Sequence, residues 1–228
     1  MTLKETNYPE SCIDLNLMNR VMRHRLRNLC AGVKMTANRI ADTTRETHPR
    51  MSSRCEIIAS ELDNLHEFTN RLDLIFDTLP ATTPKTLFEL ISELRDEFAK
   101  KHPFCTLSFE GPETQLAFPN GSLIHTCLNE LLTNAGEAAA NNGHVTLSWQ
   151  IEDEFSFEIT NDGNKIPDEI PINPPQPFNT LRSRHDGIGL SIAYRICKAL
   201  DSELFIDNLK ENTVTVTMQL SPEEFVNG

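Results

Sequence analysis

The stretch of residues 128–139, LNELLTNAGEAA, contains side chains whose types and spacing could do chemistry. Glu130, Asn134 and Glu137 follow one another at i, i+4 and i+7, so a helix would place them on one side. An amide oxygen is a hard ligand suited to Mg2+, and a carboxylate can orient a water or accept a proton. The residues beside them predict a buried apolar stripe with the same helical period: Leu128, Leu131, Leu132, Ala135 and Ala139. The stretch therefore predicts one wall of a metal and phosphate pocket, and the alternative is a surface helix with solvated polar residues.

Two glycine-containing segments further along could complete such a pocket. Asn161, at the end of an expected strand, could offer both an acceptor and a donor to a planar base, and Gly163 permits a sharp turn behind it. Gly187 and Gly189 precede an apolar-periodic helix that continues through Leu190, so backbone N–H groups and the helix dipole could meet an anion there. Each segment also has a plainer interpretation, because Asn-Asp-Gly is a common turn and a single G-x-G is not a dinucleotide fingerprint.

A histidine near the N-terminus is a candidate nucleophile. His24 lies midway between Met22 and Leu26, which places it opposite the apolar seam of its helix and predicts that it is exposed. An ordinary surface histidine is the alternative. The arginines around it predict a basic patch that could attract phosphate or an acidic partner, or could form a solvated face: Arg20, Arg23, Arg25 and Arg27.

Two long helices are expected to carry this histidine. Apolar residues step by three and four from Leu15 to about Thr43, Pro49 breaks the pattern, and a second heptad pattern runs from about Ser53 to Leu79. Residues 1 to about 14 are polar and expected to fray. The two helices should form an antiparallel hairpin whose exposed seam favours dimerisation into a four-helix bundle. We therefore expect a helical domain over residues 1–80 and a second domain over residues 81–228.

The second domain is predicted to be an α/β sandwich, a mixed sheet packed on three helices, which makes the whole chain α+β. Thr83 and Pro84 resemble an N-cap and first helical residue of a helix that ends near Lys101, and Asn120 or Ser122 would cap the helix with the polar stripe. Alternating apolar and polar residues, bounded by turn residues, predict six strands: Thr106–Phe109, Gln115–Phe118, His144–Ile151, Phe155–Thr160, Glu203–Asp207 and Val214–Leu220. Residues 161–184 contain five prolines and are expected to form a loop before the last helix, which spans 187–200.

Composition narrows the classes of function. The chain has 228 residues and a net charge of -12, which argues against a general nucleic-acid binder. No apolar run approaches the ~20 residues needed to span a bilayer, and the first residues lack the pattern of a secretory signal, so a soluble cytoplasmic protein is expected. The six cysteines are scattered and predict reduced, mostly buried thiols, with no zinc site.

The order of the motifs is more specific than any one of them. His-x-Leu-Arg-Asn is followed by Glu-Leu-Leu-x-Asn-Ala, Asn-Asp-Gly-x-x-Ile-Pro, Pro-Phe and Gly-Ile-Gly-Leu-Ser-Ile. Over about residues 15–221, this order resembles the transmitter core of sensor histidine kinases. The resemblance implies a dimerising helical hairpin and an ATP-binding sandwich of the gyrase, Hsp90, kinase and MutL type.

The resemblance also implies roles for individual residues. His24 matches the phosphoacceptor, Asn28 the position that often holds a phosphatase water, and Asn134 the Mg2+ ligand, with Glu130 as a catalytic carboxylate one turn earlier. Further matched positions would bind ATP: Asn161 at the adenine, Gly163 behind it, Phe178 beside the lid, and Gly187, Gly189 and Leu190 at the phosphates. The implied cofactors are ATP and Mg2+, and the implied partners are a second copy of the chain, the receiver domain of a response regulator, and an upstream sensor protein.

Some positions differ from the family pattern and keep two other functions open. Arg25 stands where an acid usually accepts the histidine proton, Lys165 replaces a glycine, His185 and Asp186 stand where glycine is usual, and Glu137 occupies a position that is often basic. The leading hypothesis is Mg-ATP-dependent phosphorylation of His24 followed by phosphotransfer to a response regulator. The alternatives are a histidine phosphotransferase that does not use ATP, and an ATP-binding regulatory scaffold.

Overall fold

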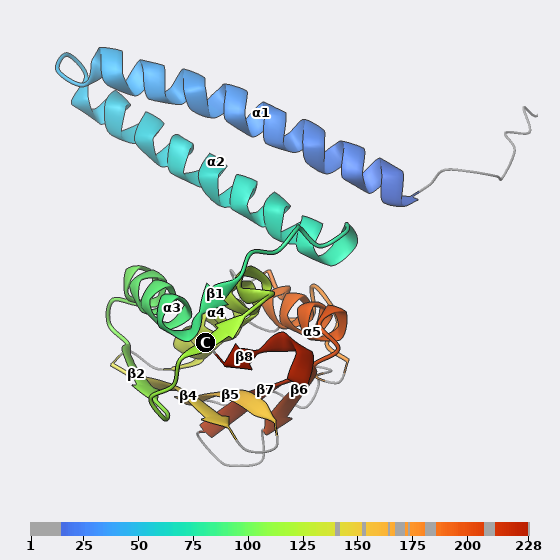
Figure 1. Cartoon of the computed structure of the whole chain (residues 1–228). Coiled ribbons are helices and arrows are strands. Elements are labelled where there is room, and N and C mark those ends of the chain that lie inside the picture. The colour runs from blue at the N-terminus through green and yellow to red at the C-terminus, as the bar shows by residue number, and fades with distance from the viewer. Residues whose placement is uncertain are drawn as a thin grey trace, which may run out of the picture. The chain divides into compact units, whose positions relative to one another are not determined.

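The computed structural model divides the chain into two compact units, Met1–Thr78 and Leu79–Gly228 (Figure 1). It describes residues 15–139, 142–151, 154–163, 165–166, 172, 174–180, 186–207 and 213–227. The predicted fraying of residues 1–14, parts of the predicted 161–184 loop and His185 lie outside the described residues.

The first unit is a helical hairpin, as the heptad patterns predict. Helix α1 spans Leu15–Thr44 and α2 spans Pro49–Phe76. The expected start of the second helix at Ser53 was wrong, because Pro49 occupies the first turn, where a missing N–H breaks no helical hydrogen bond. The helix also ends before Leu79, since Asp77 is extended and acts as the C-cap.

The surface shared by α1 and α2 is made of small and polar residues. The buried positions of α1 are Arg23, Cys30, Ala37 and Ala41, and those of α2 are Ser52, Ala59 and Thr69. Most of the large apolar residues of the predicted seam are exposed instead, among them Met18, Met22, Leu29, Val33 and Ile40. The hairpin therefore buries little of its own apolar surface and leaves a hydrophobic strip open.

The second unit is an α/β sandwich, and the predicted fold class is confirmed. Its five-stranded sheet has the order β2-β4-β5-β7-β6, in which only the β2–β4 pair is parallel. The strands are β2 (Thr106–Glu110), β4 (His144–Ile151), β5 (Phe155–Asp162), β6 (Glu203–Asp207) and β7 (Thr213–Leu220). Three helices cover one face of this sheet (Figure 1): α3 (Leu87–Lys101), α4 (Gly121–Ala138) and α5 (Gly189–Ala199).

Alternation along β5 places its odd-numbered residues in the core. Phe155, Phe157 and Ile159 are at most 2% exposed, and Phe155 and Phe157 stack edge to face with ring centroids 4.8 Å apart. Asn161 continues the same inward face and is only 4% exposed. A polar amide is thus held at the end of an otherwise apolar row.

A second, small sheet holds the segment that leads into this unit. Its order is β1-β3-β8, formed by Lys85–Thr86, Leu116–Phe118 and Val226–Asn227. The predicted helix start at Thr83 and Pro84 was wrong, because Thr86 is the N-cap of α3. Its hydroxyl accepts from the Glu89 N–H at 3.2 Å, and the Glu89 carboxylate accepts from the Thr86 N–H at 2.7 Å. This reciprocal capping box fixes the helix start more strongly than proline at the first helical position would.

The predicted cap of α4 by the side chain of Asn120 or Ser122 was wrong, because Asn120 is the N-cap residue without a side-chain cap bond and Ser122 lies within the helix. The amide oxygen of Asn120 accepts from the Thr82 hydroxyl at 2.6 Å, and its nitrogen donates to both carboxylate oxygens of Glu224 at 3.0 and 3.1 Å. Glu224 is 7% exposed and belongs to the 3-10 helix η1 (Pro222–Glu224). Asn120 therefore ties the incoming linker and the C-terminal segment to the start of α4.

We expect Asn120→Ala to destabilise the second unit by about 1–3 kcal/mol, because the buried Glu224 carboxylate would lose its two hydrogen bonds from the amide. Urea unfolding followed by circular dichroism would measure this loss. The matched control is Glu223→Ala, an exposed neighbour in η1 that should change stability by less than about 0.5 kcal/mol. Equal effects of the two substitutions would contradict the structural role of Asn120.

Candidate functional site

The polar stripe of α4 separates into a buried and an exposed part. Glu130 is 9% exposed, Asn134 is half-buried, and Glu137 is exposed. The apolar stripe beside it is buried, with Leu128, Leu131 and Leu132 each at most 3% exposed. The helix is thus amphipathic in the predicted sense, and Glu130 and Asn134 lie at the border between core and solvent, where a ligand can reach polar atoms.

The start of α5 lies directly against this border. A Cβ atom placed on Gly189 would be 2.9 Å from Oε2 of Glu130 and 3.1 Å from both the oxygen and the nitrogen of the Asn134 amide. A larger residue here would require the ends of these two side chains to move. The N-cap of α5 is Ile188, whose side chain has no polar atom to bond the first-turn N–H groups. The site therefore combines an acid, an amide and a helix start that attracts anions.

A turn held by Gly187 precedes α5. Gly187 has a φ of +66°, which glycine adopts without strain, and its carbonyl accepts from the Phe178 N–H at 2.9 Å. Phe178 itself has a φ of 65° and is 53% exposed, so its ring lies at the surface. Leu190, the next predicted contact, is half-buried in the first turn of α5.

The end of β5 forms another part of the site. Gly163 pairs with Ala139 just after α4, and a Cβ on Gly163 would overlap the carbonyl oxygen of Ala138 and lie 2.8 Å from the Asn161 nitrogen. That nitrogen is buried and has no hydrogen-bond partner among the described residues. The strand end thus presents a buried amide beside a position where only glycine fits.

His24 is exposed on α1, as the sequence predicts, and its Nδ1 lies 3.3 Å from the side-chain nitrogen of Asn28 one turn later. An amide can present either its oxygen or its nitrogen to a ring, and the two are exchanged by a rotation of the side chain. In the observed arrangement the amide N–H donates to Nδ1 and the ring proton is on Nε2. With the amide rotated, its oxygen would accept from Nδ1–H and leave Nε2 with a free lone pair. Asn28 is therefore placed to choose the tautomer of a nucleophilic imidazole.

The predicted basic patch around His24 was wrong for most of its members. Arg23 is 3% exposed and donates to Asp73 and Asp77 of the α2 side at 2.6 Å each. Arg27 also pairs with Asp73, and Arg20 with Asp77 at 3.2 Å. These arginines face carboxylates within the hairpin and are not an open patch.

Sequence reasoning missed this ion-pair cluster of Arg20, Arg23, Arg27, Asp73 and Asp77 because its partners are about 50 residues apart. A signal was present, since the arginines and the aspartates each recur at helical spacing of three or four. Arg25 is exposed, and no ion pair joins it to any described residue of the hairpin. Its charge is therefore available to an external anion.

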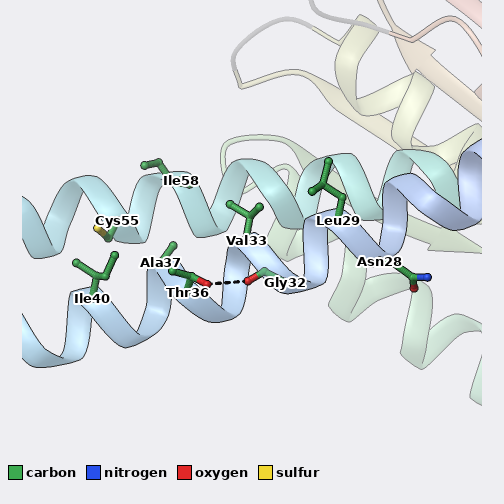
Figure 2. Close-up of a pocket in the computed structure, with 9 residues that line it drawn as sticks. All are labelled: Asn28, Leu29, Gly32, Val33, Thr36, Ala37, Ile40, Cys55 and Ile58. Atoms are coloured by element: carbon green, nitrogen blue, oxygen red, sulfur yellow. Dashed lines mark hydrogen bonds between the residues drawn. The ribbon is translucent and has the colours of Figure 1, made fainter.

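A hydrophobic groove runs along the hairpin from Asn28 toward the loop between the helices (Figure 2). Its lining comes from both helices, and its apolar members Leu29, Val33 and Ile58 are 62%, 42% and 47% exposed. The remaining lining residues are Gly32, Thr36, Ala37, Ile40 and Cys55. The groove is a surface suited to packing against another apolar helix.

The polar groups around α4 and α5 suit a metal-bound polyphosphate better than a metal ion alone. The described residues contain no group of three His, Cys, Asp or Glu side chains that could hold a metal by themselves. Mg2+ often takes only one or two protein ligands and completes its coordination with water and phosphate. Asn134 and Glu130 offer oxygen atoms of that kind, so their chemistry fits a Mg2+–phosphate complex.

The five described cysteines are free thiols, three of them buried, as predicted.

Comparisons with known proteins identify the class of this fold. Residues 120–223 match the family model described as histidine kinase-, DNA gyrase B- and HSP90-like ATPase. The sensor protein CreC of Escherichia coli (strain K12) is 24% identical over 185 residues, which cover 72% of this chain and 38% of CreC. The chain therefore spans well under half the length of this relative.

Solved structures agree with this class. Full-length ShkA, solved in complex with AMPPNP, matches 93% of this chain and 47% of its own with a TM-score of 0.76 and 13% identity. The catalytic domain of the histidine kinase ThkA matches 62% of this chain and 95% of its own, with a TM-score of 0.54 and 26% identity. The second unit is a histidine kinase-like ATPase domain. Together the two units have the architecture of a histidine kinase transmitter core, which confirms the resemblance seen in the motifs.

In the described part of the chain, no helix has both the length and the apolar character needed to cross a membrane.

The ion-pair cluster should make the hairpin sensitive to acid. Burial alone would raise the pKa of Asp77, but its hydrogen bonds and charge interactions with Arg23 and Arg20 outweigh burial and lower this pKa. The stabilisation is therefore complete above the unfolded-state pKa, about 3.9, and is lost as the pH falls through the lower folded-state value. We expect the urea midpoint of the helices to fall between about pH 5 and pH 2, and to fall less in Asp77→Asn. If the urea midpoint fell equally with pH in the wild type and in Asp77→Asn, Asp77 would not be the responsible group.

Proposed function

We propose that this chain is a protein histidine kinase that binds Mg-ATP in the second unit and transfers the γ-phosphoryl group to His24. An aspartate in the receiver domain of a response regulator would then accept the group. The observation that carries this proposal is the approach of Glu130 and Asn134 to Gly189 at the start of α5, in a domain of the histidine kinase-like ATPase type.

Each part of the site has a task in this reaction. The adenine base of ATP would lie at Asn161 and Gly163. Its phosphates would lie near Gly187, Gly189 and Leu190 at the start of α5. Mg2+, held by Asn134, would neutralise charge on the phosphates. Glu130 would orient water or the ligands around Asn134. The exposed ring of Phe178 would border the opening of the site.

At His24, a lone pair of the imidazole attacks the γ-phosphorus while the bond to the bridging oxygen breaks and ADP leaves. The ring also loses its proton, which a nearby base usually accepts. Arg25, the next residue, cannot accept a proton, so water at the exposed ring would take it. The positive charge of Arg25 would favour the phosphorylated form of the neighbouring histidine.

Arg25 also favours a second candidate function. A chain without a proton acceptor beside His24 would suit a phosphotransferase, which exchanges phosphoryl groups between proteins and does not use ATP. The retained pair Glu130 and Asn134 supports the kinase instead, because a pure phosphotransferase would have no need for them. An ATP-binding regulatory scaffold, the remaining alternative, would require nucleotide binding but no phosphate on His24.

We infer that the protein works as a homodimer through its hairpin. Apolar side chains of α1 that remain exposed in a single hairpin, such as Met22, Leu29 and Val33, would be buried in a four-helix bundle. The groove beside Asn28 provides a surface for the second copy (Figure 2). Sedimentation equilibrium would measure the mass of the assembly.

Incubation with ATP labelled in the γ position, with Mg2+, should leave an acid-labile, base-stable phosphate on the wild-type protein. His24→Ala should abolish the label, and Asn134→Ala should reduce its rate at least about 100-fold, because phosphoryl transfer depends on charge neutralisation by the metal. His66→Ala, an exposed histidine of α2, is the matched control and should retain the label. Label that persists in His24→Ala would exclude His24 as the acceptor. Transfer from a phosphorylated receiver that does not require Asn134, without any labelling by ATP, would support the phosphotransferase.

Gly189→Ala tests the geometry of the nucleotide site. The new methyl group would lie within about 3 Å of Glu130 and Asn134 and displace them, so AMPPNP with Mg2+ should bind at least about tenfold more weakly by calorimetry. Gly32→Ala is the control, because a Cβ there would meet nothing within 4 Å. Unchanged affinity in Gly189→Ala would place the nucleotide elsewhere.

A further inference from the structure

Asn161 is the most deeply buried polar group at the end of β5, and its surroundings bear on which base the site accepts. The side chain is 4% exposed and continues the row of Phe155, Phe157 and Ile159 toward the helices. Its nitrogen, Nδ2, is buried and has no hydrogen-bond partner within the described part of the chain. A buried donor without an acceptor is costly, so this atom favours a ligand that brings an acceptor to it.

Gly163 lies beside that donor and packs against the backbone of Ala138. A Cβ on Gly163 would lie 2.8 Å from Nδ2 and would overlap the carbonyl oxygen of Ala138. The Ala139–Gly163 bridge holds the backbone of this turn in place. The turn therefore fixes the backbone next to the Asn161 N–H group that has no partner among the described residues.

An amide differs from a carboxylate in what it can recognise. Asn161 presents one donor group and one acceptor side by side, and rotation of the amide exchanges their positions. The Watson–Crick edge of adenine pairs the N6 donor with the N1 acceptor, and a 6-oxopurine pairs the O6 acceptor with the N1 donor. Both edges are complementary to an amide. A carboxylate at the same place would offer two acceptors and repel O6.

From this chemistry, we propose that Asn161 is a specificity-determining residue that lets the nucleotide site accept 6-oxopurine nucleotides as well as adenine nucleotides. The inference rests on the proposed function, since it assumes that the second unit binds a purine nucleotide. It goes further by naming the class of base. Nδ2 donates to O6 or N1 of the base, and the amide oxygen accepts from N1 or N6.

Calorimetric titration of the full chain with ADP, IDP and GDP, each with Mg2+, tests this assignment without any catalytic step. IDP is the decisive ligand, because hypoxanthine has the O6 and N1–H groups that Asn161 would recognise. It lacks the 2-amino group of guanine, which could weaken GDP binding by a clash unrelated to Asn161. We expect IDP to bind within about tenfold of ADP in the wild type, because the amide forms two hydrogen bonds with either base. In Asn161→Asp, the ratio of the IDP to the ADP dissociation constant should rise at least about tenfold, because one hydrogen bond becomes a repulsion.

The outcomes separate the inference from the proposed function. ADP binding with IDP more than about 100-fold weaker in the wild type overturns the inference and leaves the kinase proposal standing, and this result needs no variant to fold. An unchanged IDP-to-ADP ratio in a folded Asn161→Asp protein also overturns it. If neither nucleotide binds, the proposed function fails and the inference fails with it. Asp162→Asn, the exposed neighbour, is the matched control and should leave the ratio unchanged.

Discussion

The close approach of α4 and α5 at Gly189 is the constraint on which the chemistry of this protein depends. The polar residues of α4 can bind a phosphate-containing ligand only if an anion-binding group lies beside them. Gly189 does so because the absence of a Cβ brings the uncapped start of α5 within contact of Glu130 and Asn134. The apolar residues of both helices, such as Leu128 and Ile192, are fully buried and hold this arrangement rigidly.

The two units obtain their structure in different ways. The second unit buries a large core that includes the aromatic cluster of Phe118, Phe155 and Phe157. The hairpin instead joins its helices through small residues and the ion-pair cluster, while its large apolar side chains stay exposed. The ion pairs join particular positions of the two helices and so favour one register of the hairpin. The hairpin has therefore kept its hydrophobic surface available, which is what a helix that packs against a second copy needs.

Much of this architecture could be predicted from local sequence patterns, and the exceptions share one physical cause. Helical and strand periods predicted the long elements, and motif order predicted the class of the second unit. The two-residue strands β1 and β8 carry no period, and they form only because β3 lies between them. The arginines at 20, 23 and 27 were interpreted as an open patch because their carboxylate partners lie on another helix. The unpaired nitrogen of Asn161 likewise depends on what surrounds it in three dimensions.

The linker shows how such long-range contacts bear on the site. Lys85 packs so closely on the start of α4 that a Cβ on Gly121 would lie 2.5 Å from its backbone nitrogen, and Asn120 bonds both Thr82 and Glu224. The segment through which the chain enters the second unit is thus fixed to the first turn of the helix that carries Glu130. Helices are stiff along their axes, so a displacement of this segment acts on α4 as a whole. Because the start of α5 lies close to the Glu130 carboxylate, a shift of α4 would change the distance between the acid and the start of α5.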